Sequence, residues 1–154
     1  MLAYNTFVRS KLEYAAVVWD PHTKKNIMNL ERVQRKAIRF IFSKYKREDS
    51  PSLIMLANKI STLENRRKIS RLQFLHNIIN GKSALQQPHC VKPLSSRQTR
   101  HRHNLSLTPI FSKTKSHMNS FFPRTIHEWN SIPVDVLQSQ NFAEELEKHL
   151  SSIN

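Results

Sequence analysis

The chain has 154 residues and a formal net charge of +14, with 25 Lys and Arg against 11 Asp and Glu. Its single glycine excludes phosphate-binding loops of the Walker and GxGxxG types, which need several glycines where the backbone approaches phosphate. Its single cysteine excludes an internal disulfide and a multi-cysteine zinc knuckle. No apolar run approaches the ~18 residues of a membrane span and no signal-peptide pattern opens the sequence. We therefore expect an intracellular protein, nuclear or cytoplasmic, that is not secreted and has no membrane partner.

Four helices are predicted in the first half of the chain. Apolar residues through positions 2–19 indicate a first helix that ends at Asp20-Pro21, because proline disfavours helix at the residue before it. A second helix is predicted over about residues 24–44, and Ser50-Pro51 is typical of the start of a short third helix. The inward face predicted for the second helix comprises Ile27, Leu30, Val33, Ala37 and Ile41.

A capping box at residues 61–64, with Ser61 at its start and Glu64 three positions later, predicts the start of the fourth helix. Asn80-Gly81 predicts its end, since glycine favours the left-handed conformation that closes a helix. The expected architecture up to this point is a small helical bundle.

The second half of the chain differs from the first in composition. Residues 82–104 contain few apolar side chains and predict an exposed basic connection. A short extended segment is expected over residues 105–111, followed by a helix around residues 120–130 with Pro123 in its first turn or at a kink, and by a last helix capped by Asn141. The predicted fold class is mainly α: a small helical bundle, a basic loop, a short extended segment and two further helices. The predicted divisions are residues 1–81, 82–104 and 105–154.

The positive charge is unevenly distributed. Residues 1–64 carry 12 basic and 6 acidic side chains, a net of +6. Residues 65–127 carry 12 Lys or Arg, six His and no acidic residue, whereas residues 128–154 carry five acidic residues and only Lys148 as a base. A long stretch without acidic residues keeps a positive field that suits a polyanion such as a nucleic-acid backbone. The alternative is a basic surface that serves only solubility.

Two sets of basic residues are candidates for phosphate contacts. The first lies on the outward face of the predicted second helix, where only Glu31 provides an acid at i,i+4 spacing. The second lies in the basic connection and beyond it. A solvated helix face explains the first set equally well. The first set is Arg32, Arg35, Lys36 and Arg39. The second set is Arg97, Arg100, Arg102, Lys113, Lys115 and Arg124.

No catalytic, cofactor or metal site is predicted. The acidic residues of the first half are dispersed, and we expect them on helix surfaces or at helix caps rather than as a paired catalytic site. His101 and His103, with Cys90 and His89 nearby, are the only candidate metal ligands. The two histidines alternate with Arg100 and Arg102, whose charges oppose a bound cation. The helical spacing of the large aromatic residues favours core packing over base stacking. These aromatic residues are Trp19, Phe121, Phe122 and Trp129.

Several motifs in order resemble one known family. They are VRSKLEYAAVVWDP at residues 8–21, LERVQRKA at residues 30–37, Arg66-Arg67 with Arg71-Leu72, Arg100-His101, and SFFPRTI at residues 120–126 with Trp129-Asn130. This series resembles the thumb and the following region of jockey-like non-LTR retrotransposon reverse transcriptases, and it covers most of the chain.

The resemblance implies a part of an RNA-directed DNA polymerase that holds the template–primer duplex by its backbone. The family's catalytic motif contains two adjacent aspartates, and no Asp-Asp pair occurs in this sequence. The chain alone is therefore expected to be inactive, with an RNA, DNA or RNA–DNA hybrid backbone as its partner and with the palm and fingers of a parent polymerase as further partners. The alternatives are a helical protein-interaction or structural module and a non-functional remnant of an element.

Overall fold

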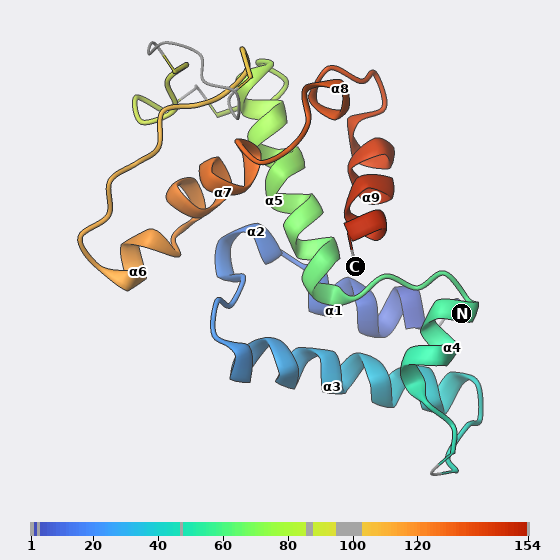
Figure 1. Cartoon of the computed structure of the whole chain (residues 1–154). Coiled ribbons are helices and arrows are strands. Elements are labelled where there is room, and N and C mark those ends of the chain that lie inside the picture. The colour runs from blue at the N-terminus through green and yellow to red at the C-terminus, as the bar shows by residue number, and fades with distance from the viewer. Residues whose placement is uncertain (1, 3, 47, 86–87, 95–102, 154) are drawn as a thin grey trace. The chain divides into compact units, whose positions relative to one another are not determined.

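The computed structural model describes residues 2, 4–46, 48–85, 88–94 and 103–153. The chain forms two compact units, Met1–Lys68 (unit 1) and Ile69–Asn154 (unit 2). Regular secondary structure in the described ranges is helical apart from an isolated bridge between Pro93 and Leu107, so the predicted mainly α fold class is confirmed (Figure 1). The unit boundary falls inside helix α5, whereas the sequence analysis placed its first division after residue 81; that three-part division stays a prediction.

Unit 1 begins with short helical segments rather than one continuous helix. The predicted first helix is broken at Tyr14 and Ala15, and Ala15 has a left-handed φ of 49°. The helix that follows begins at Lys24 as predicted, and the next begins at Pro51 with Ser50 at its N-cap position. The elements are η1 (Tyr4–Arg9, π-helical), α1 (Ser10–Glu13), α2 (Ala16–Trp19), α3 (Lys24–Ile41), α4 (Pro51–Ala57) and the first turns of α5 (Leu63–Ile79).

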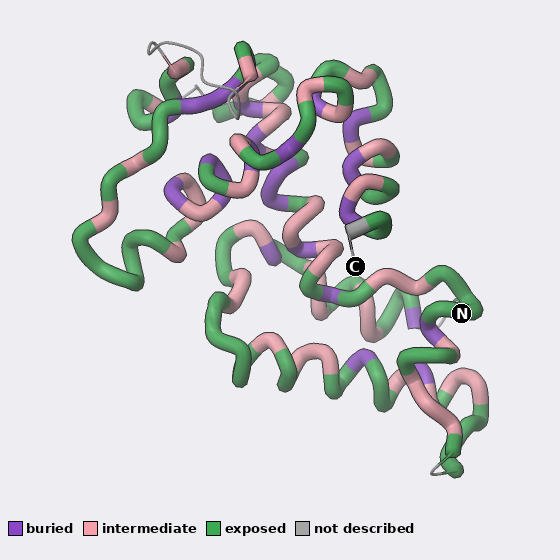
Figure 2. The backbone as a smooth tube through the Cα atoms, in the orientation of Figure 1, coloured by how far each residue is buried: buried purple, intermediate pink, exposed green. Residues whose placement is uncertain are grey.

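The buried face of α3 is rotated from the predicted one. Gln34 and Ile38 are completely buried, whereas Val33, predicted to face inward, is 45 % exposed (Figure 2). The buried Gln34 amide donates a hydrogen bond from Nε2 to the carbonyl oxygen of Ser61, 3.2 Å away. A polar residue therefore occupies the centre of this face because a backbone acceptor lies opposite it.

The start of α5 differs from the predicted capping box by one residue. Thr62 precedes the helix, and its Oγ1 accepts a hydrogen bond from the backbone N–H of Asn65 at 3.3 Å. The end of the helix agrees with the prediction, since α5 stops at Ile79 and Gly81 has a φ of 64°. The local signals thus place both ends of this helix to within one or two residues.

Unit 2 contains the rest of α5 and four further helices, of which α7, α8 and α9 pack with α5 around one apolar core, whereas α6 is exposed. Pro123 lies in the first turn of α7, which was one of its two predicted positions, and not at a kink. The short helix α8 was not predicted. No described helix is long and apolar enough to cross a membrane. The further elements are α6 (Lys115–Met118), α7 (Phe121–Trp129), α8 (Val134–Leu137) and α9 (Phe142–Ile153). The core includes Leu72, Leu75, Val91, Leu107, Ile126, Trp129, Ile132, Leu137, Phe142, Leu146 and Leu150.

The aromatic residues largely follow the core-packing expectation. Trp129 is 3 % exposed, and Phe121 and Phe122 are half-buried and form an edge-to-face pair with ring centroids 4.9 Å apart. Trp19 differs, since 40 % of its surface is exposed. Its indole Nε1 donates to the carbonyl oxygen of Tyr14 at 2.6 Å, next to the break between α1 and α2.

The end of α7 fixes the extended segment that precedes α6. The Asn130 amide pairs with the backbone of Leu107 in both directions: Oδ1 accepts from its N–H at 2.8 Å and Nδ2 donates to its carbonyl at 2.9 Å. The Trp129 indole Nε1 donates to the carbonyl of Leu105 at 3.0 Å. The side chains of Trp129, the last residue of α7, and of its C-cap residue Asn130 thereby hydrogen-bond the backbone as a strand partner would and hold residues 105–107 beside the helix end.

Candidate nucleic-acid interface

Three of the four basic residues predicted on α3 lie on an exposed stripe. Arg32, Arg35 and Lys36 are exposed and lie on the outward side of the helix. Arg39 is half-buried instead, and its Nη2 donates to the carbonyl oxygen of Asp49 at 3.4 Å. We use the name α3 stripe for Arg32, Arg35 and Lys36 alone.

The one acidic residue of α3 is turned toward the start of α5 and lies near Arg35 of this stripe. Glu31 is half-buried, and its Oε1 accepts a hydrogen bond from the backbone N–H of Glu64 at 2.9 Å. This places a carboxylate at the first turn of α5, where the helix dipole favours negative charge. Burial raises the pKa of Glu31, and the hydrogen bond from Glu64 opposes that rise. Glu31 thus caps the start of α5, and its charge also interacts with Arg67 and with Arg35 of the stripe.

Glu13 likewise forms ion pairs within unit 1, with two arginines. Its carboxylate lies 2.6 Å from Nη2 of Arg66 and 3.2 Å from Nε of Arg9. Burial raises the pKa of Glu13, and the positive charges of Arg9 and Arg67 act against that rise. The carboxylate is held inside a small ionic cluster and not on the free helix surface that the sequence analysis expected.

Asp20 lies at the C-cap position of α2, in agreement with the predicted helix cap, but its side chain is buried. Its Oδ1 accepts a hydrogen bond from Nε of Arg67 at 2.7 Å, and the two side chains are only 6 % and 1 % exposed. The residue before Pro21 thus does more than end a helix: it supplies the counter-charge for a buried arginine. No local pattern in the sequence indicated this role, because Arg67 lies 47 positions from Asp20.

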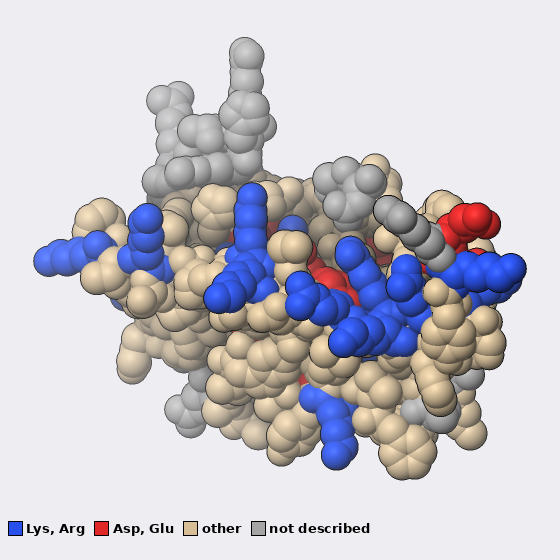
Figure 3. Space-filling model, turned by 90° about the horizontal axis from the view of Figure 1, so that it is seen from below, with Lys and Arg blue, Asp and Glu red and all other residues tan. Residues whose placement is uncertain are grey.

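Most acidic residues of unit 1 therefore make contacts within the unit, and of the α3 stripe only Arg35 has a charge interaction with Glu31 among the described contacts. Glu31 and Glu13 are half-buried, Asp20 is buried, and Asp49 accepts a hydrogen bond from the backbone of Lys46 at 3.2 Å. Figure 3 shows one face of the molecule, on which many more Lys and Arg than Asp and Glu side chains are visible. A surface of this kind attracts polyanions through charge and not through base recognition.

The second predicted set of basic residues is only partly brought together. Lys113 and Lys115 are exposed in and just before α6. Arg124 on α7 is half-buried and lies 3.5 Å from Glu128, measured from Nε to Oε1. Arg97, Arg100 and Arg102 lie outside the described residues.

Sequence reasoning missed the structural role of Arg71. Its Nη2 donates to both carboxylate oxygens of Glu128, at 2.9 and 2.8 Å, and its side chain is only 2 % exposed. Burial lowers the pKa of Arg71, and the charge of Glu128 opposes that change. An arginine in this environment is part of the interior of unit 2 and does not reach a phosphate. Its partner is 57 positions away, so no local pattern indicated the pair.

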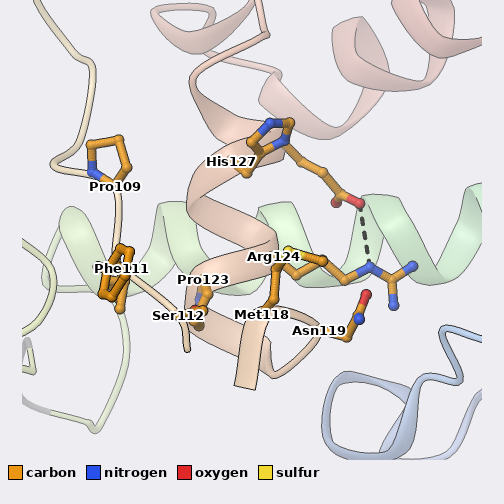
Figure 4. A pocket seen from close by; sticks show the side chains of 10 residues that line it. Pro109, Phe111, Ser112, Met118, Asn119, Pro123, Arg124 and His127 are labelled. Atoms are coloured by element: carbon orange, nitrogen blue, oxygen red, sulfur yellow. Dashed lines mark ion pairs between the residues drawn. The ribbon is translucent and has the colours of Figure 1, made fainter. Parts of the chain in front are cut away.

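Sequence reasoning also missed a pocket of about 650 Å³ in unit 2. One wall is the segment that contains Pro109 and Phe111, and another is α7 with Arg124 and His127 (Figure 4). The walls come from segments that are separate in the sequence, which is why no spacing indicated the pocket. Over the described ranges, no group of three or more His, Cys, Asp or Glu side chains is arranged to hold a metal ion.

No protein-family model, curated protein or solved structure matches the chain. The function is therefore inferred from its own side chains.

Proposed function

We propose that this chain binds the backbone of RNA, DNA or an RNA–DNA hybrid without sequence preference, through the α3 stripe. The observation that carries the proposal is the one-sided charge of α3: Arg32, Arg35 and Lys36 are exposed, whereas the helix's only acid, Glu31, is turned toward α5. Flexible cations on one helix face contact phosphates through charge, and such contacts position a duplex without reading its bases.

In this proposal the chain corresponds to the thumb and following region of a jockey-like non-LTR retrotransposon reverse transcriptase, the family that its motifs resemble. The palm and fingers of a parent polymerase would supply the catalytic aspartates. Two motif arginines, Arg67 and Arg71, take a structural role here, because both are buried beside carboxylates. Motif residues of this chain thus divide into those that build the helices and those that remain available for phosphate.

The test is binding to a fluorescein-labelled RNA–DNA hybrid, followed by anisotropy at several salt concentrations. The wild-type chain should show a steep fall of log affinity with log salt, and hybrids of different sequence should bind equally. Replacing Arg32, Arg35 and Lys36 together by Gln should reduce the slope by about three, or one for each lost phosphate contact.

A matched variant controls for net charge. Lys11, Lys59 and Lys92 are exposed and lie outside α3, so their joint replacement by Gln removes the same three charges. The proposal expects this control to lower the slope much less than the α3 variant does. Equal slopes for the two variants, or no binding by the wild-type chain, would contradict it.

A second candidate function is supported by exposed apolar side chains on the same helix. Phe40 is 75 % exposed and Val33 is 45 % exposed, and their spacing of seven residues puts them on one side of α3. Exposed apolar surface of this kind is typical of protein–protein contacts. For a protein-interaction module, the charge would serve solubility and the salt slope of the wild-type chain would be flat.

A further inference from the structure

The pocket in unit 2 is mostly apolar and has a size that suits a small planar group. Its volume of about 650 Å³ lies within the range of about 300–1,000 Å³ that is usual for small-molecule sites. Trp129 and Asn130 hold residues 105–107 against the end of α7, and the chain then continues as the pocket wall. The pocket is thus a product of fixed backbone contacts. Its apolar lining residues are Pro109, Ile110, Phe111, Met118 and Pro123.

Two apolar side chains of this lining are exposed at the protein surface. Phe111 is 82 % exposed and Met118 is 53 % exposed. An aromatic ring and a polarizable thioether are surfaces on which a flat ring packs well. Figure 4 shows the Phe111 ring on the loop side of the pocket, opposite the side chains of α7.

The charges around the pocket are positive or already paired. Lys113 directly follows the lining residue Ser112, and Lys115 lies two positions further; both are exposed. The one acidic lining residue, Glu128, accepts two hydrogen bonds from Arg71. A negatively charged occupant is therefore not repelled by a free carboxylate of the lining.

We propose that this pocket holds an unpaired base of single-stranded nucleic acid, stacked on Phe111, while Lys113 and Lys115 contact the neighbouring phosphates. The inference rests on the proposed function and deepens it, because it assigns single-stranded nucleic acid to unit 2 and duplex backbone to the α3 stripe. Stacking of bases on aromatic side chains beside a cationic track is the usual way in which proteins bind single strands without reading sequence. An acidic peptide would satisfy the charge but would not need an exposed aromatic platform.

The experiment compares a 12-nucleotide single strand of deoxythymidine with an RNA–DNA hybrid, using the complete chain and fluorescence anisotropy at fixed low salt. The substitution Phe111→Ala should weaken single-strand binding roughly 5- to 150-fold, the cost of one lost base–aromatic stack. Affinity for the hybrid and the slope of log affinity against log salt should stay unchanged. Phe111→Trp, which keeps an aromatic face, should restore single-strand binding.

Phe7→Ala is the matched control, because Phe7 is a phenylalanine of unit 1 that is similarly exposed, at 73 %. It should change neither affinity. The proposal is overturned if Phe111→Ala leaves single-strand binding intact, if it weakens single strand and hybrid equally, or if an acidic phenylalanine-containing peptide occupies the pocket and the oligonucleotide does not displace it.

The two proposals fail in different ways. If the α3 variant loses its salt slope on the hybrid while Phe111→Ala has no effect, the proposed function stands and the pocket assignment is wrong. If single-strand binding depends on Phe111 while the α3 variant binds the hybrid with an unchanged slope, the pocket assignment stands and the α3 interface is wrong.

Discussion

The pair formed by Asp20 and Arg67 provides a direct test of how unit 1 is stabilised. Nε of Arg67 lies 2.7 Å from Oδ1 of Asp20, and neither side chain has appreciable contact with water. The substitution Asp20→Ala removes the carboxylate that is hydrogen-bonded to the buried guanidinium, while the charges of Glu13 and Glu31 continue to act on it. Removing one partner of a buried ion pair costs about 3–5 kcal/mol. That is a large part of the roughly 5–15 kcal/mol by which a domain is stable, so the variant should unfold at much lower urea concentration.

Equilibrium urea unfolding, followed by circular dichroism at 222 nm, measures this loss. Asp135→Ala is the matched control, because Asp135 is an exposed aspartate of α8 and its replacement should change the unfolding free energy by no more than about 0.5 kcal/mol. The double variant Asp20→Ala with Arg67→Met also removes the buried guanidinium charge and should be more stable than Asp20→Ala alone. A loss below about 1 kcal/mol for Asp20→Ala, or a double variant less stable than the single one, would refute the reasoning.

Two further predictions concern Glu31 and His76. Glu31→Ala removes the acceptor for the Glu64 N–H at the start of α5 and should lower the unfolding free energy by about 0.5–2 kcal/mol. Glu31→Gln should lose less, because its side chain keeps an acceptor oxygen. Equal urea midpoints for the wild-type chain and the two variants would contradict this role. His76 stacks on Phe142 with ring centroids 4.4 Å apart, and burial, followed by the charge of Lys82, lowers its pKa from the usual 6.5. Because the pKa of His76 is lower in the folded than in the unfolded chain, its neutral form contributes fully to stability above about pH 6.5. This contribution is lost as the pH falls through the folded-state pKa. The drop in melting temperature between pH 7 and pH 5 should therefore be smaller for His76→Phe than for the wild-type chain, and equal drops would argue against the burial of a neutral His76.

The parts of the fold that could be predicted are those with local signals. Pro51 marks the start of α4, Gly81 follows the end of α5 with a positive φ, and Pro123 lies in the first turn of α7. Each depends on the backbone preferences of one or two residues, which the sequence displays directly. The break at Ala15 has no such signal, since neither glycine nor proline occurs there.

The parts of the candidate site that could not be predicted depend on contacts between distant residues. Outward placement of Arg32, Arg35 and Lys36 follows from helical periodicity, and the structure agrees with it. The burial of Arg67 does not follow, because its partner Asp20 lies 47 positions away. A basic residue in a sequence predicts a positive surface only after its acidic partners have been located in space.

The measurement that tests the central claim most directly is protection of Lys36 from chemical acetylation by a bound RNA–DNA hybrid, read by mass spectrometry. Lys36 belongs to the α3 stripe, and Lys11 is an exposed lysine outside it, so both should be labelled in the free chain. At low salt the hybrid should slow the labelling of Lys36 and leave Lys11 unchanged, and high salt should abolish the protection, since backbone binding by charge weakens steeply with salt. Labelling of Lys36 at the same rate with and without saturating hybrid would contradict a nucleic-acid interface on α3.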